Sequence, residues 1–216
     1  MLYELIDTGN SGSFPSAHAL LEKAESHGDA VVIIGENVAR ALQVLAGREG
    51  KLAVLIELGS EALGAHTGES RAEEGSNVVG FSRFRIGSAE PTNLVEVIRQ
   101  PRTAETALAA AKEIFEAAGL QVAVCGDFDG RILDRLVRPY FNAALRRLDE
   151  GLASASDLDK TLELGLGYPE GPIALLERTG LEHHYDVTQA LYQALGDPAY
   201  APARRARVAK QRQKSK

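Results

Sequence analysis

The sequence predicts an α/β layer over residues 1–127 and an all-α helical bundle after it. In the first part, short apolar runs of strand length alternate with segments of helical spacing, a pattern typical of parallel β-α units. From residue 128 onward, apolar residues recur every three or four positions, which is typical of helices that pack together. We expect the bundle to fill residues 128–200, with a basic, disordered tail over 201–216.

Six runs of the first part have the length and composition of buried strands. The expected strands are residues 2–7, 29–35, 52–58, 78–84, 94–98 and 121–125. The expected helices are residues 17–26, capped by Ser16, then 37–46, and finally 104–118, stopped by Gly119. Residues 64–77 are polar and are expected to form a loop or a short helix.

The second part begins with a long amphipathic helix over residues 132–148, inside which Pro139 predicts a kink. A second helix starts near residue 157, capped by Ser156, and stops at Gly165 or Gly167. After a turn rich in glycine and proline, a third helix begins at residues 173–178. A helix with so wide an apolar face needs other helices around it, which favours a bundle and a homodimer.

Length and composition are those of a globular protein with one or two domains. The 216 residues are 44% hydrophobic and 25% charged, and no apolar run approaches the roughly 20 residues that span a bilayer. The first residues lack a basic region followed by an apolar run, so we expect no secretory signal and no membrane partner. Cys125 is the single cysteine, which excludes an internal disulfide and favours a cytoplasmic protein.

The net charge of −6 hides a strong asymmetry. Residues 204–216 carry seven basic residues and no acidic one, so the remainder is −13, because −13 plus 7 gives −6. A solvated, disordered end is one explanation of this segment, and recruitment of an acidic partner is another. The segment has no aromatic residue to stack on bases, so no nucleic-acid partner is expected.

Three segments carry a specific resemblance: Gly130–Tyr140 (GRILDRLVRPY), Asp157–Asp159 and Leu164–Pro172 (LGLGYPEGP). They closely resemble the C-terminal domain of the 3-hydroxyacyl-CoA dehydrogenase family. Residues 93–98 resemble the strand that leads out of the family's dinucleotide-binding domain, and the likeness covers roughly residues 78 to 200. The resemblance implies a reduced Rossmann-like layer followed by a helical domain like the C-terminal domain of 6-phosphogluconate dehydrogenase.

A dinucleotide site needs a glycine-rich turn between the first strand and the first helix, where backbone amides meet the pyrophosphate. Residues 8–13 (TGNSGS) do not give the G-x-G-x-x-G spacing. Gly35 follows a good strand, but Glu36 comes next, and an uncompensated carboxylate there would repel the cofactor. We therefore expect no bound cofactor, although the resemblance itself implies NAD.

The resemblance also implies four site residues. In the family, a histidine takes the proton of the 3-hydroxyl while hydride leaves for NAD, a glutamate orients that histidine, and a serine and an asparagine bind the substrate oxygen. Glu96 matches the glutamate, Ser82 stands at the histidine position, Asp134 at the asparagine position, and Ser60 loosely at the serine position. A serine hydroxyl is no general base near neutral pH without a base of its own.

The histidines offer no obvious substitute base, and each is expected at the surface. They are His18, His27, His66, His183 and His184. The last two are adjacent and would point to different sides of a helix, so we expect no metal site. Without the resemblance, an ion pair with Arg83 or Arg99 is the favoured explanation of Glu96.

Three functions compete. The favoured one is a non-catalytic or weakly active relative of 3-hydroxyacyl-CoA dehydrogenases that dimerises through its helical domain and binds an acyl-CoA. The second is an active NAD-dependent 3-hydroxyacyl-CoA (3-hydroxybutyryl-CoA) dehydrogenase with an unorthodox base. The third is an interaction protein that recruits an acidic partner through its basic tail.

Overall fold

A computed structural model describes residues 1–68 and 76–215. The chain divides into two compact units, Met1–Arg85 with Pro91–Arg131, and Ile86–Glu90 with Ile132–Lys216. The short segment from Ile86 to Glu90 thus folds with the helices, although it lies between two strands in the sequence. Part of the predicted loop over 64–77, residues 69–75, lies outside the described residues.

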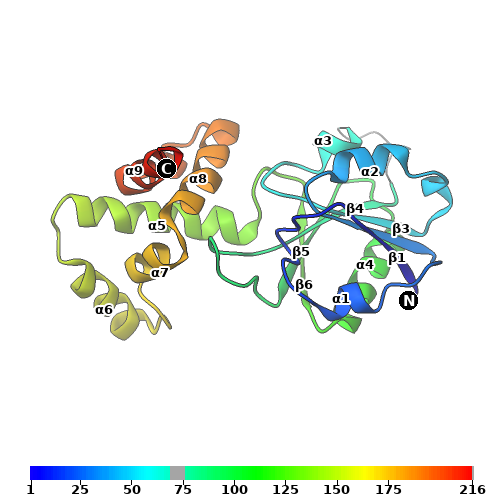
Figure 1. The fold of residues 1–216 in the computed structure, drawn as a ribbon, viewed down its shortest axis with the longest axis horizontal. Coiled ribbons are helices and arrows are strands. Elements are labelled where there is room, and N and C mark those ends of the chain that lie inside the picture. Colours follow the sequence, from blue (N-terminus) through cyan, green and yellow to red (C-terminus); the bar gives the residue numbers. More distant parts are fainter. Residues whose placement is uncertain (69–75, 216) are drawn as a thin grey trace. The chain divides into compact units, whose positions relative to one another are not determined.

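The first unit contains a six-stranded sheet in the order β1-β2-β3-β4-β5-β6 (Figure 1). The strands are β1 (Tyr3–Asp7), β2 (Ala30–Ile34), β3 (Ala53–Glu57), β4 (Val78–Arg83), β5 (Leu94–Arg99) and β6 (Gln121–Gly126). Strands β1 to β4 are parallel, β5 runs antiparallel to β4, and β6 runs parallel to β5. The α/β layer predicted from the sequence is confirmed.

The first unit also contains short helices and one long one. They are α1 (Ala19–Glu22), α2 (Val38–Val44), the 3₁₀ turn η1 (Arg48–Gly50), α3 (Gly64–Thr67) and α4 (Glu105–Ala117). The prediction of a helix over 17–26 capped by Ser16 is wrong, since α1 is a single turn capped by the ring of His18. The helix ends early because the amide of Glu25 donates to the carbonyl of Tyr3, which draws the chain alongside β1.

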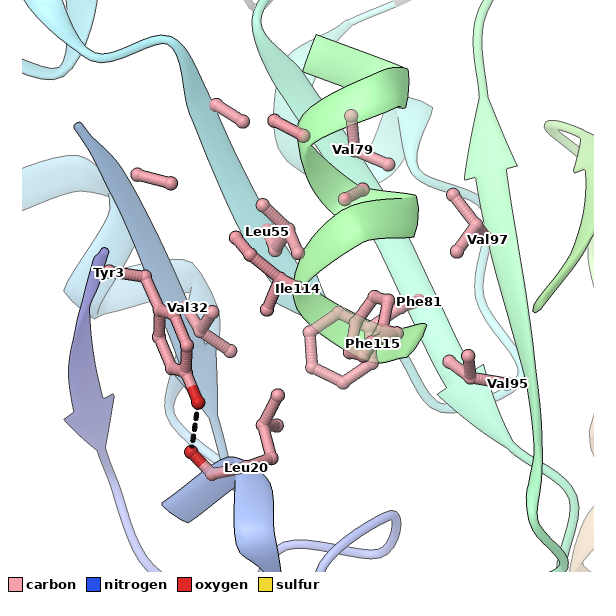
Figure 2. Packing of buried hydrophobic residues seen from close by; sticks show 14 of the residues in the cluster. Tyr3, Leu20, Val32, Leu55, Val79, Phe81, Val95, Val97, Ile114 and Phe115 are labelled. Atoms are coloured by element: carbon pink, nitrogen blue, oxygen red, sulfur yellow. Dashed lines mark hydrogen bonds between the residues drawn. The ribbon is translucent and has the colours of Figure 1, made fainter. Parts of the chain in front are cut away.

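One face of the sheet is covered by α4 and α1. Figure 2 shows Ile114 and Phe115 of α4 among the side chains of the strands, and the Tyr3 hydroxyl donating to the Leu20 carbonyl at 2.5 Å. The rings of Phe81 and Phe115 are tilted with centroids 5.0 Å apart, an arrangement worth about 0.5–1.5 kcal/mol beyond the area that it buries. This cluster is the larger core of the unit.

The opposite face is covered by α2, whose Val38 and Leu42 are buried against the strands. The connection from β1 to β2, which includes Leu20, lies on the α4 face, whereas the connection from β2 to β3 lies on the α2 face. Both advance in the same direction along the sheet, so they have opposite hands, and one departs from the usual right-handed crossover. Connections that part to opposite faces open a crevice at the carboxyl ends of their strands.

The second unit is a helical bundle, as predicted. It contains α5 (Ile132–Asp149), α6 (Ala155–Leu166), α7 (Pro172–Thr179), α8 (Leu181–Leu195), the 3₁₀ turn η2 (Pro198–Tyr200) and α9 (Arg204–Lys214). Its core includes Phe141, Leu145 and Leu176. The cap of α6 is Ser154 rather than the predicted Ser156, because its hydroxyl accepts a hydrogen bond from the amide of Asp157 at 3.1 Å.

The prediction of a disordered tail is wrong for α9. Ala206 is fully buried, and Arg204 and Arg205 both form ion pairs with Asp149 at the end of α5. Lys210 forms a further ion pair with Asp186 of α8. Three of the seven basic residues of this segment therefore have acidic partners that are distant in the sequence, which composition alone does not reveal.

Along the described parts of the chain, no helix has both the length and the apolar character that crossing a membrane requires.

Candidate functional site

The register of β4 and β5 places Ser82 directly opposite Glu96. Directly paired residues of antiparallel strands point to the same face of the sheet, so both side chains lie on the α2 face. Glu96 is buried, with 2% of its surface exposed, and Ser82 is half-buried. On the other side, Glu96 pairs with Ala123 of β6. Two of the four predicted site residues are thus brought together.

A buried guanidinium lies close enough to act on this face. Arg131 is 3% exposed, and its charge interacts with those of the carboxylates Glu61, Asp127 and Glu96. Burial lowers the pKa of Arg131, and these acidic groups oppose that shift. Its Nη atoms donate to four backbone carbonyls, those of Gly59, Glu61, Phe128 and Gly130. Among the described residues its Nε has no hydrogen-bond partner.

Cys125 lies on the same face, since it follows Ala123 by two positions along β6. Burial raises the pKa of its thiol, and the nearby charge of Glu96 raises it further. The protonated thiol is the unreactive form, so Cys125 serves as a small apolar residue at the end of a strand.

The other two predicted site residues, Ser60 and Asp134, belong to other segments of the chain. Ser60 follows β3, and its carbonyl accepts a hydrogen bond from the amide of Gly130 at 2.6 Å, which joins two loops of the first unit. Asp134 belongs to α5 in the second unit, where its carboxylate accepts from Nε of Arg138 at 2.7 Å. Arg138 is 1% exposed and Asp134 is half-buried, so this is a partly buried ion pair within one helix.

Arg138 also forms a hydrogen bond with His184. Its Nη1 lies 3.3 Å from Nδ1 of His184, and His184 Nε2 lies 3.0 Å from Oδ1 of Asn142. Because a guanidinium can only donate, Nδ1 is the acceptor and Nε2 carries the proton. Burial, with the charge of Arg138 as a second cause, lowers the pKa of His184 to about 3. His184 is therefore a neutral core residue, and the prediction that it lies at the surface is wrong.

The remaining histidines have local roles. His18 Nδ1 accepts from the amide of Leu20, and burial lowers the pKa of the ring. His66 Nε2 lies 3.3 Å from a carboxylate oxygen of Glu61, and His27 and His183 are exposed. Within residues 1–68 and 76–215, no group of three His, Cys, Asp or Glu side chains could hold a metal ion.

The two arginines considered as partners of Glu96 both bind other groups. Arg99 forms an ion pair with Glu105 at 2.7 Å. Arg83 points to the opposite face of the sheet from Ser82, lies over the ring of Phe14, and donates from Nη1 to the carbonyl of Ser13 at 2.8 Å. Arg83 thereby fixes the loop that follows β1.

A buried carboxylate occupies the crevice at the carboxyl ends of β1, β2 and β3. Glu57, the last residue of β3, is 7% exposed. Its Oε2 accepts from the Ser11 hydroxyl at 2.8 Å and from the Gly35 amide at 2.7 Å, and its Oε1 accepts from the Ser13 amide at 2.6 Å. The two segments considered for a cofactor loop thus meet around an acid of this chain.

Gly35 is required for this geometry. Its φ is +101°, and a Cβ there would overlap the carbonyl oxygen of Gly9. Glu57 is not among the site residues predicted from the sequence. The sequence does contain an indication of its role. An acid that interrupts the apolar run LAVLIEL inside a buried strand must have polar partners.

The helical unit is similar to a domain of known proteins. Residues 130–216 match the family model described as 3-hydroxyacyl-CoA dehydrogenase, C-terminal domain. The 3-hydroxybutyryl-CoA dehydrogenase of Bradyrhizobium diazoefficiens is 36% identical over 109 residues, which are 50% of this chain and 37% of that protein. Human mitochondrial hydroxyacyl-coenzyme A dehydrogenase is 36% identical over 109 residues, which are 46% of this chain and 35% of that protein.

The solved structure of (S)-3-hydroxybutyryl-CoA dehydrogenase from Ralstonia eutropha superimposes with a TM-score of 0.69 and 28% identity, covering 86% of this chain and 66% of that one. The helical unit, over residues 130–216, belongs to the family of 3-hydroxyacyl-CoA dehydrogenase C-terminal domains. The chain spans less than two fifths of the length of the two curated relatives named above. The family match includes all of α9, so the basic segment is part of the family's C-terminal domain.

Proposed function

We propose that this protein is a non-catalytic or weakly active 3-hydroxyacyl-CoA dehydrogenase homologue that has no working nicotinamide site, dimerises through its helical unit and binds an acyl-CoA. The observation that carries the proposal is the cross-strand pair of Ser82 and Glu96. In the family pattern, Glu96 matches a glutamate that orients a histidine base, and Ser82 stands where that base belongs.

Without the base, the proton of a 3-hydroxyl has no acceptor of suitable pKa at this position. A positioned general base contributes about 10²–10⁴-fold to a rate, and serine provides it only when a further base activates the hydroxyl. The acid opposite Ser82 is Glu96, which is buried and interacts electrostatically with Arg131. We therefore expect a rate that is lower than that of an ordinary family member by at least this factor.

The residues at the crevice do not fit a dinucleotide. A pyrophosphate needs free amide donors at the start of a helix, but the Ser13 and Gly35 amides already donate to Glu57. The Glu57 carboxylate adds a negative charge at the place where a second anion would have to bind. Helix α1 is also a single turn, too short for the dipole that supports a phosphate.

Acyl-CoA binding is proposed from the relatives, whose names describe dehydrogenases of 3-hydroxybutyryl-CoA and hydroxyacyl-coenzyme A. Dimerisation is supported by α6, whose Leu164 and Leu166 are 77% and 65% exposed. Burying a leucine side chain contributes about 1.5–3 kcal/mol. Two such residues on one helix favour a contact with a second copy.

Cofactor binding separates this proposal from that of an active dehydrogenase with an unorthodox base. The chain has no tryptophan, so the fluorescence of NADH itself reports binding without overlapping protein emission. We expect no change when NADH is titrated with the protein, and a saturable response when a CoA thioester is titrated by calorimetry. Saturable NADH binding would contradict the cofactor-free proposal.

A further inference from the structure

We propose that the crevice at the carboxyl ends of β1–β3 is a preformed site for a small carboxylate, and that Glu57 is its built-in ligand. Three donors converge on this side chain within 2.8 Å: two backbone amides and one hydroxyl. They come from the connections after two different strands. This is the donor set that a protein uses to bind a free carboxylate or another oxyanion.

The donors are held in place by contacts that do not involve Glu57. The Thr8 hydroxyl donates to the Ile34 carbonyl at 2.7 Å and accepts from the Asn37 amide at 3.1 Å. The Glu36 amide donates to the carbonyl of Gly9 at 3.0 Å. These bonds join the loop after β1 to the loop after β2, so the Gly35 amide keeps its direction when the carboxylate is removed.

The other two donors are fixed on the far side of the crevice. The Ser11 hydroxyl accepts from the amide of Phe14 at 2.8 Å, which leaves its own proton for Oε2 of Glu57. The Ser13 hydroxyl accepts from the amide of Arg83 at 3.1 Å, and Arg83 also binds the Ser13 carbonyl. A buried guanidinium therefore stands behind the loop that supplies two of the three donors, and its charge favours an anion.

The ligand class follows from the shape of the side chain. Replacing Glu57 by alanine removes one methylene carbon and the carboxylate group, and these atoms correspond to acetate. The space that they vacate lies next to a polar hollow of about 440 Å³ whose lining includes Ser11 and Gly12. Gly12 is also close to Oε1 of Glu57, because a Cβ there would lie 3.7 Å from this atom. The hollow gives a small carboxylate a path to the three donors.

The test compares Glu57→Ala with Glu57→Gln in the full chain. Both variants lose the charge, but only alanine leaves room for a ligand, so glutamine is the matched control. We expect acetate to raise the melting temperature of Glu57→Ala progressively with concentration, relative to chloride at equal ionic strength. The wild type and Glu57→Gln should respond equally to the two anions. Pivalate has the same charge as acetate but a larger alkyl group, so it should not raise the melting temperature of Glu57→Ala.

Equal stabilisation of Glu57→Ala by acetate and chloride would overturn the proposal, as would an equal response of Glu57→Gln to acetate. If Glu57→Ala does not fold in chloride, recovery of its circular dichroism spectrum in acetate but not in pivalate supports the site, and failure to recover in acetate overturns it. The inference does not rest on the proposed function. Turnover with NADH would contradict that function and leave this result unchanged.

Discussion

Burial strongly alters the ionisation of His184. The unfolded chain binds a proton at this ring below about pH 6.5, whereas the folded chain binds it only near pH 3. Because the folded pKa is depressed, the folded state loses stability as the pH falls from 6.5 toward 3. The full shift corresponds to about 5 kcal/mol by the linkage relation.

Replacing His184 by glutamine tests this linkage. Glutamine can accept from Arg138 and donate to Asn142, but it does not titrate. We expect the variant to be less stable than the wild type at pH 7 by about 1–2 kcal/mol, because the packing is imperfect. Urea unfolding should show this difference shrinking or reversing at pH 4.5. A difference that is independent of pH would show that His184 is not neutral in the fold.

Gly35 offers a second test among the residues. A Cβ there would overlap the carbonyl oxygen of Gly9, at a φ of +101° that side chains rarely adopt. Gly35→Ala should cost about 3 kcal/mol or more through combined strain and overlap. Gly47 has a φ of +69° with open space around it, so Gly47→Ala should cost about 1 kcal/mol. Chemical unfolding of the two variants measures the difference, and equal costs would contradict the close approach.

The elements differ in how far the sequence determines them. All six strands were predictable, because each is a short run rich in apolar residues and bounded by turn residues. The extent of α1 and the fold of α9 were not, since both depend on partners far along the chain, such as Tyr3 for Glu25 and Asp149 for Arg204. Such contacts override local propensity and composition.

The candidate site also has features that the sequence predicts and features that it does not. The pair of Ser82 and Glu96 follows from motif positions together with strand register. The environment of Glu57 depends on two loops meeting at the end of β3, which no spacing rule describes. His184 was expected at the surface because a single sequence gives no sign of the buried guanidinium that it faces.

Helix α9 can be tested as a packed element rather than a free tail. Ala206 is fully buried and Gln213 is exposed on the same helix. Ala206→Asp should destabilise the helical unit by about 2–4 kcal/mol, because it buries an unpaired charge, whereas Gln213→Asp should be nearly neutral. Urea unfolding followed by circular dichroism measures both. If both substitutions change the free energy of unfolding by equal, small amounts, α9 is a solvated tail and not a packed helix.

At the scale of the whole molecule, the helical unit should mediate self-association. Leu164→Arg places a charge on the exposed face of α6 and should convert a dimer to a monomer in sedimentation velocity experiments. Val44 of α2 is also exposed, at 72%, so Val44→Arg is the matched control and should leave the dimer intact. A monomeric wild type, or a dimer that survives Leu164→Arg, would contradict this part of the proposal.

We propose that this homologue lacks a working hydride-transfer site. The most direct test mixes the full chain with NADH and acetoacetyl-CoA and follows the loss of NADH by absorbance. Glu96→Gln tests the site, and Glu116→Gln, an exposed change on α4, controls for folding. We expect no turnover above background at protein concentrations far above those that an ordinary dehydrogenase needs. Steady turnover that Glu96→Gln abolishes and Glu116→Gln preserves would contradict it.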